Sequence, residues 1–266
     1  MKLAKFLLAA ICFMAAQAAF AWGADGHRIV GEVADQDLTP RTRMAVSKLM
    51  DGADSLSSVA TWMDEVRGEH QYAYLKPWHF LNTEVCDPKV SPCRDGNCAP
   101  SRINWAIGEL KSGDQARQAM GLRVLVHLVG DIHQPLHAAD NEDGGGNGVT
   151  ISNRRCGRYG CELHAYWDST LVKETMRGVK RATIGATFAS YARLPANDSM
   201  DPNEWAKESF VLAQKVAYHF NGFACGQRGD VELSPDYDQA ALSTVRTQLS
   251  VAGHRLARVL NSVFDR

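Results

Sequence analysis

The segment from Asp114 to Asp131 constrains the fold of this 266-residue chain more than any other. Its apolar residues occupy nearly every side of a helix instead of one stripe: Leu122, Val124, Leu125, Val126, Leu128 and Val129. A helix that is apolar nearly all round is buried, and Pro135 does not allow it to continue much further. The pattern therefore predicts a buried central helix.

Other helix signals are spread along the chain. Thr39-Pro40 is typical of a helix start, with an N-cap residue followed by proline at the first helical position, and this helix should end near Gly52. Asp201-Pro202 opens another helix in the same way. Further helices are expected over residues 162–177, 183–192, 202–221 and about 238–264.

Strand signals are scarce, and only Val149–Ser152 between glycines predicts one arm of a small β-hairpin. Residues 84–100 and 144–148 are expected to be loops because they are rich in proline, aspartate and cysteine or in glycine. No change of composition divides the chain, so residues 22–266 should form a single, mainly helical (all-α) domain with long loops.

The first 21 residues are predicted to be a signal peptide. Lys2 and Lys5 precede an uncharged run, and Ala19-Phe20-Ala21 fits the cleavage rule of signal peptidase. A membrane anchor is the alternative, but the apolar run is short and no positive flank follows it. Cleavage would leave Trp22 as the new N-terminus, and the protein would be secreted or periplasmic.

The cysteines indicate an oxidising compartment. Cys12 lies in the signal peptide, and the remaining six are an even number. Two pairs are five residues apart, a spacing suited to small loop-closing bridges, and a thiolate metal site is disfavoured because no Cys-x-x-Cys occurs. We therefore predict three disulfides: Cys93–Cys98, Cys156–Cys161 and, by elimination, Cys86–Cys225.

Histidine and aspartate recur together. His127 and Asp131 are four residues apart, as are His164 and Asp168, so each pair lies on one face of a helix. One such pair is usually a surface ion pair, but two pairs with isolated partners favour a metal cluster. Nitrogen and carboxylate ligands without thiolate suit zinc best. Three further candidates lie in aromatic or apolar contexts: Asp64, His79 and His137.

The motifs together resemble the secreted, zinc-dependent type I nucleases of fungi, plants and bacteria. These single-strand-preferring enzymes share a fold with the trinuclear-zinc phospholipases C. The resemblance covers most of the chain after the signal peptide. It rests on Trp22-Gly23-x-x-Gly26-His27, Trp62-Met63-Asp64-Glu65-Val66-Arg67, Trp78-His79-Phe80, the run from Val126 to His137, Gly145-Gly146-Asn147 and Leu163-His164-x-x-Trp167-Asp168.

The resemblance implies three zinc ions per chain. The first would be held by Asp64, His79, His127 and Asp131. The second would be held by His137, His164 and Asp168. The third would be held by the α-amino nitrogen and carbonyl oxygen of Trp22 and by His27, with Asp131 as a bridging carboxylate. Neutral imidazole, carboxylate and a free amine are all zinc ligands.

The resemblance also implies the reaction, which is hydrolysis of phosphodiesters to 5′-phosphates and removal of terminal 3′-phosphates. Three dications would supply the positive charge that a chain of net charge −1 lacks, with Asp64 and Asp131 as catalytic metal ligands. Arg67 matches the family arginine that binds phosphate, although a surface ion pair is the alternative. RNA, single-stranded DNA and nucleotides would be the substrates.

The residues expected to bind the base differ in part from the fungal pattern. Phe80 corresponds to the ring on which an unpaired base stacks. Asn82 stands where the fungal pocket has an aspartate, and Gly144 stands where it has an apolar residue. Asn82 can donate as well as accept hydrogen bonds, and Gly144 removes one wall of the pocket.

Two other functions stay open. A phospholipase C-type phosphodiesterase would use the same zinc arrangement, but that branch typically has glutamate where this chain has Asp168. A secreted protein that only binds zinc would keep the ligands and would not need Arg67 or Phe80. We expect the protein to be a monomer without stable membrane association.

Overall fold

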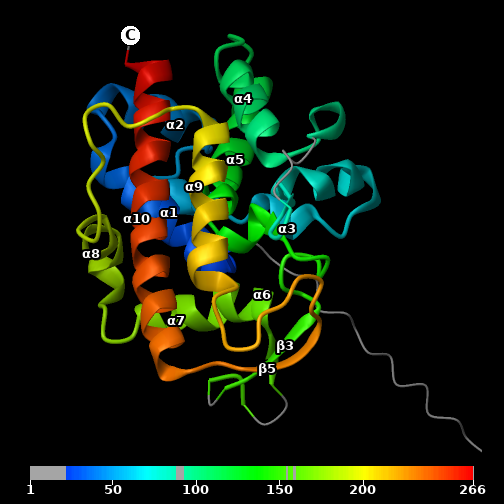
Figure 1. The fold of residues 1–266 in the computed structure, drawn as a ribbon. Coiled ribbons are helices and arrows are strands. Elements are labelled where there is room, and N and C mark those ends of the chain that lie inside the picture. Colours follow the sequence, from blue (N-terminus) through cyan, green and yellow to red (C-terminus); the bar gives the residue numbers. More distant parts are fainter. Residues whose placement is uncertain (1–21, 88–92, 154, 158–159, 266) are drawn as a thin grey trace, which may run out of the picture.

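A computed structural model describes residues 22–87, 93–153, 155–157 and 160–265. The predicted signal peptide, residues 1–21, lies outside the described residues. The described part is mainly helical, as predicted from the sequence (Figure 1). None of the helices in these ranges is both long and apolar enough to cross a membrane.

Helix α5 (Gln115–Ile132) is the predicted central helix. The Asp114 side chain caps it by accepting a 2.9 Å hydrogen bond from the Arg117 amide. Its second half, from Leu122 onwards, is buried apart from Arg123, and Figure 1 shows it enclosed by the long helices. The polar pair His127 and Asp131 is buried together with its apolar neighbours, so the site begins in the core.

Four helices form most of the cover around α5: α1 (Ala24–Asp37), α4 (Ala99–Leu110), α9 (Pro202–Leu212) and α10 (Pro235–Phe264). Helix α10 packs against α1 so closely that a Cβ at Gly253 would lie 2.4 Å from the Val33 side chain. Helices α1 and α4 were not predicted. Helix α1 contains two glycines and has no side-chain cap at its start, and α4 begins inside the segment expected to be a loop.

The other predicted helices are confirmed with changed ends. The first one, α2 (Pro40–Leu49), is capped by Thr39, and a short α3 (Trp62–Val66) follows later in the chain. Residues 163–175 form one helix whose middle turn is π-helical, with α6 (Leu163–Ala165) and α7 (Val172–Thr175) at its ends. Helix α8 covers only Ile184–Ala189. Helix α9 continues as a π-helical turn over Ala213–Ala217.

Two small sheets carry the loops of the site. Strand β3 (Val149–Ser152) pairs antiparallel with β4 (Cys161–Glu162), which confirms the predicted hairpin arm. Strand β5 (Gly229–Glu232), which was not predicted, pairs parallel with β3. A second parallel pair joins β1 (Thr83–Glu84) to β2 (Ala139–Asp140). These short strands pair segments that are far apart in the sequence.

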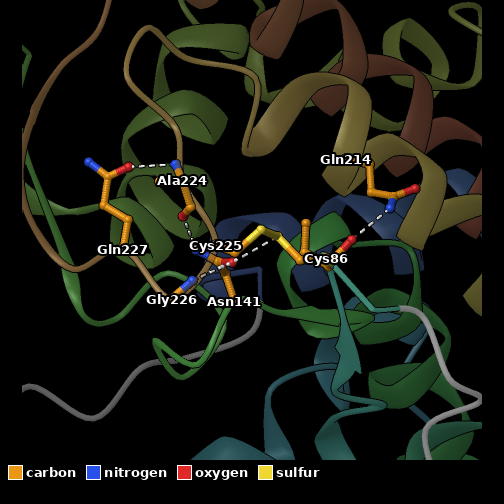
Figure 2. Close-up of a disulfide and its surroundings, with 8 residues drawn as sticks. Cys86, Asn141, Gln214, Ala224, Cys225, Gly226 and Gln227 are labelled. Carbon is orange, nitrogen blue, oxygen red and sulfur yellow. Dashed lines mark hydrogen bonds between the residues drawn. A yellow bond between two sulfur atoms is a disulfide. The ribbon is translucent and has the colours of Figure 1, made fainter.

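The three predicted disulfides are present, and Cys86–Cys225 spans 139 residues. Figure 2 shows that this bridge lies beside Asn141. The side-chain nitrogen Nδ2 of Asn141 donates to the Ala224 carbonyl, and its side-chain oxygen Oδ1 accepts from the backbone amide of Gly226, each at 3.1 Å. The bridge therefore attaches the segment after α9 to β1 and to the loop that follows β2.

Removing the long bridge should destabilise the protein more than removing a short one. A disulfide stabilises the folded protein because it lowers the conformational entropy of the unfolded chain. The expected stabilisation is about 5 kcal/mol for a loop of this length and about 2 kcal/mol for a five-residue separation. Replacing Cys86 and Cys225 by serine should therefore lower the free energy of unfolding by more than replacing Cys156 and Cys161 does. Guanidinium denaturation at a fixed metal concentration measures both. Equal losses would contradict the loop-length argument.

Candidate metal centre

The structure gathers the predicted histidines and aspartates into three adjoining groups. In each group the ligand atoms lie within 4.8 Å of one another. The first two groups share His127. The residues come from α1, α3, α5, the 3-10 turns that end at His79 and His137, and α6 with its π-helical extension. The groups are His27, His127 and Asp131; Asp64, His79 and His127; and His137, His164 and Asp168.

Asp131 belongs to the first group and also lies close to two residues of the second. One of its oxygens, Oδ1, lies 3.2 Å from Nε2 of His27. The other, Oδ2, lies 2.8 Å from Nδ1 of His79 and 3.5 Å from Nε2 of His127. Because α5 places His127 one turn before Asp131, both point to the same side of the helix. A carboxylate in this position can serve two cations at once.

Backbone carbonyls orient three of the imidazoles. Nδ1–H of His127 donates to the Ala60 carbonyl at 2.8 Å, that of His137 to the His79 carbonyl at 2.9 Å, and that of His164 to the Gly145 carbonyl at 2.6 Å. Each bond leaves Nε2 with its lone pair directed into the site. Metal-binding histidines are held in this way in proteins.

The Nε2 atoms of His137 and His164 face each other. Nε2 of His137 lies 3.2 Å from Nε2 of His164, and both rings already use their Nδ1–H on carbonyls. Two lone pairs at this distance repel each other unless a cation lies between or beside them. Nε2 of His164 is also 3.2 Å from an oxygen of Asp168, which adds a third electron-rich atom. This geometry fits a bound metal ion.

Many polar atoms of the site are buried without a hydrogen bond. Such atoms are rare in folded proteins and need an explanation. Within the described residues, seven of them belong to the predicted ligand set: Trp22 Nε1, His27 Nδ1, His27 Nε2, Asp64 Oδ1, His79 Nε2, Asp131 Oδ1 and Asp168 Oδ2. Except for the Trp22 indole, these are nitrogen and carboxylate atoms of the kind that binds zinc, so the residues present fit such a metal.

The charge states of His127 and Asp131 also suit a cation. Burial lowers the pKa of His127 to about 4, so its imidazole is neutral at neutral pH. Burial alone would raise the pKa of Asp131, but the imidazoles of His127, His27 and His79 hold that pKa well below its usual value. Neutral imidazole and ionised carboxylate are the forms that bind metal.

Trp22 lies at the edge of the cluster. Its side chain is fully buried, and a Cβ at Gly26 would lie 2.6 Å from the Trp22 Cβ. The amide of Gly23 donates to the Asp168 carbonyl at 2.8 Å, which holds the backbone after Trp22 next to the third group. The structure thus places Trp22 beside the first turn of α1 and the segment that carries Asp168.

The predicted substrate-binding residues lie beside the metal groups. Arg67 follows α3 directly and is half-buried; burial raises the pKa of Asp64, and the positive charge of Arg67 is among the groups that oppose this shift. The Phe80 ring is tilted against the His137 ring at 4.7 Å between centroids. Asn82 and Gly144 are exposed; Asn82 directly precedes β1, which pairs with β2, and the Gly144 amide donates to Oδ1 of Asp140 at the end of β2.

Two neighbours of the site were missed or set aside in the sequence. The amide nitrogen of Gln134, which was not singled out, donates to Oδ1 of Asp168 at 2.7 Å. Its position between the candidate ligands Asp131 and His137 was the available signal. His133 is buried outside the cluster: Nδ1–H donates to the Val129 carbonyl, and Nε2 accepts from Arg255.

A methyl group at Gly130 should disturb the first group. A Cβ there would lie 2.8 Å from Nδ1 of His27, closer than real contacts allow, so His27 must move. We expect Gly130→Ala to bind metal roughly 10- to 100-fold more weakly. Gly108→Ala is the matched control, because the same change in α4 meets no atom within 4 Å and should not weaken metal binding. Metal content after dialysis against a chelator measures both, and unchanged retention in Gly130→Ala would contradict the packing argument.

Comparison with known proteins agrees with the site. The model of the S1/P1 nuclease family matches residues 22–265. Endonuclease 4 of Arabidopsis thaliana is 28% identical and covers 93% of this chain and 90% of its own length. Nuclease S1 of Aspergillus oryzae is 25% identical over 93% of both chains, and nuclease P1 of Penicillium citrinum is 26% identical over 91% of this chain and 97% of its own. The chain therefore belongs to the S1/P1 nuclease family.

Proposed function

We propose that this chain is a zinc-dependent endonuclease that hydrolyses RNA and single-stranded DNA to 5′-phosphate products and also removes 3′-phosphates. Membership of a nuclease family supports phosphodiester hydrolysis as the reaction. The observation that carries the proposal is the set of three adjoining histidine and aspartate groups around Asp131, with Arg67 and Phe80 at its edge.

Apart from the Trp22 indole nitrogen, the seven buried atoms of the site that lack a hydrogen bond belong to side chains that we propose as zinc ligands. Asp64, His79, His127 and Asp131 would hold one zinc ion, and His137, His164 and Asp168 a second. His27, Asp131 and the free amino terminus of Trp22 would hold a third. When bound, these ions supply Lewis acidity that activates water and neutralises charge on the phosphate and on the leaving oxygen.

Arg67 and Phe80 would position the substrate. A guanidinium can donate two parallel hydrogen bonds to phosphate oxygens, and these strengthen as charge develops on them in the transition state. Phe80 would stack on a base, which requires that the base be unpaired and so favours single strands. Asn82 and Gly144 would border the base, with Asn82 able to donate and accept.

The protein would act outside the cytoplasm. Three disulfides favour an oxidising compartment, in agreement with a signal peptide over residues 1–21 and a secreted or periplasmic location. We propose a monomer without stable membrane association, acting on RNA, single-stranded DNA and nucleotides. A phospholipase C-type activity is less well supported, because Arg67 and Phe80 suit a nucleotide substrate.

Metal analysis combined with substrate assays tests the proposal. The purified protein should contain about three zinc ions per chain, and chelation should abolish hydrolysis and lower the melting temperature, because bound metal stabilises only the folded state. Denatured DNA should be cleaved faster than duplex DNA, and phosphatidylcholine vesicles should not be hydrolysed. Active enzyme with one zinc ion or none, or hydrolysis of the vesicles alone, would refute it.

Replacing Arg67 tests its role at the phosphate. Arg67→Ala should lower kcat/KM by about 2–4 kcal/mol in transition-state terms, with zinc content unchanged, because it removes a charge-assisted contact and no ligand. Arg117→Ala serves as a control, since Arg117 forms an exposed ion pair with Glu109. If the two variants cleave an oligonucleotide at the same rate, Arg67 is only a surface charge.

Replacing Phe80 tests base stacking. Phe80→Ala should reduce kcat/KM on a single-stranded oligonucleotide by about 1–3 kcal/mol, the usual contribution of one base stacked on an aromatic ring. A phosphodiester without a base provides the comparison and should be hydrolysed at nearly the wild-type rate. An equal loss on both substrates would show that Phe80 instead packs against His137 to support the site.

A further inference from the structure

The loop between β2 and β3 contacts His164 directly. His164 donates through Nδ1–H to the Gly145 carbonyl at 2.6 Å and through its own amide to the Gly146 carbonyl at 3.3 Å. Gly145 has a φ of 66°, and a Cβ there would lie 2.6 Å from the Leu136 carbonyl oxygen. The loop backbone is therefore wedged between the residues that precede His137 and those that carry His164, and its position sets the direction of the His164 ring.

Two aspartates inside the loop hold its backbone. Oδ1 of Asp140 accepts hydrogen bonds from the amides of Asp143, Gly144 and Gly145, at 2.9 to 3.2 Å. Oδ1 of Asp143 accepts from the Gly146 amide at 2.8 Å. The peptide unit between Gly145 and Gly146, whose carbonyl accepts from the His164 ring, is thus itself held by Asp143.

Tyr218 reaches this loop from another part of the fold. It follows the π-helical turn that ends α9, and its hydroxyl donates to Oδ1 of Asp143 at 2.9 Å. Both side chains are buried, and burial raises the pKa of Tyr218, so the hydroxyl keeps its proton at neutral pH. Tyr218 therefore adds a fixed donor from outside the loop.

The chain after Tyr218 follows the same loop. The Arg228 side chain donates to the Glu142 carbonyl, with Nε at 2.9 Å, and the Gly229 amide donates to the Gly148 carbonyl at 3.0 Å. Asn141 is bound by the residues around Cys225 (Figure 2). Among these contacts with the loop, the hydrogen bond from Tyr218 to Asp143 is the one that joins two buried side chains.

We infer that Asp143 and Tyr218 are positioning residues that fix His164 for metal binding through the loop backbone, an inference that rests on the proposed zinc site. The connection runs from the Tyr218 hydroxyl to Asp143, from Asp143 to the Gly146 amide, and from the adjoining carbonyls to His164. Neighbours that orient a ligand in this way strongly affect metal affinity.

The stability of the fold alone does not explain the Asp143 carboxylate. The second oxygen of Asp143, Oδ2, is buried without a hydrogen-bond partner among the described residues, and such an atom destabilises a fold. Buried polar atoms without a hydrogen bond are expected mainly at functional sites.

Zinc release from the zinc-loaded protein that begins at Trp22 tests the inference. Tyr218→Phe should release its most weakly held zinc ion to a chromophoric chelator at roughly 10- to 100-fold lower chelator concentration than wild type, with an unchanged far-ultraviolet circular dichroism spectrum. Thr42→Val is the control, because Thr42 is a buried residue whose hydroxyl accepts a hydrogen bond from Thr39, and its helix, α2, carries no proposed metal ligand. The control should release zinc as the wild type does.

Two Asp143 variants keep the test decisive. Asp143→Ala removes the acceptor of both Gly146 and Tyr218 and should release zinc at least as easily as Tyr218→Phe. Asp143→Asn retains one acceptor oxygen and should restore most of the affinity. Wild-type zinc release in both Tyr218→Phe and Asp143→Ala would overturn the inference while leaving the nuclease proposal intact, whereas a wild-type protein that binds no zinc would refute that proposal itself.

Discussion

Burial of the Asp131 carboxylate within a cage of imidazoles is the interaction on which the rest of the structure depends. The side chain is fully buried, with His27, His79 and His127 around it. Removing a carboxylate from water is unfavourable unless charges or hydrogen bonds compensate. The three imidazoles come from separate segments, so α1, α5 and the turn before Phe80 must pack together for Asp131 to be buried at all. Metal binding and folding are therefore expected to be linked in this protein.

Around that cage, backbone carbonyls serve as a second layer. Ala60, His79 and Gly145 each accept an Nδ1–H and direct the opposite ring nitrogen into the site. Their own positions depend on elements that bind no metal, including the paired β1 and β2 and the Cys86–Cys225 bridge. The architecture thus holds the polar cluster rigid from the outside, and this suits a site in which several ligands must converge on closely spaced cations.

Much of the fold was predictable because its signals are local. The apolar run of α5, the Thr39 and Asp201 caps and the alternation in β3 each depend on neighbouring residues. Helices α1 and α4 were missed because tertiary packing outweighs their weak local signals; Gly253 of α10, for example, admits Val33 of α1. Strand β5 was missed for a similar reason, since its partner lies about 80 residues earlier in the chain.

The sequence by itself determined the chemistry of the candidate site: imidazole and carboxylate groups at helical spacing, six cysteines in pairable positions and motifs that resemble one nuclease family. Those properties are residue types and short spacings, which a sequence states directly. Only the tertiary structure decided that Asp131 lies between two of the groups, that Gln134 holds Asp168, and that Tyr218 reaches Asp143. These contacts join residues from separate elements, so their geometry depends on how the helices and loops pack together.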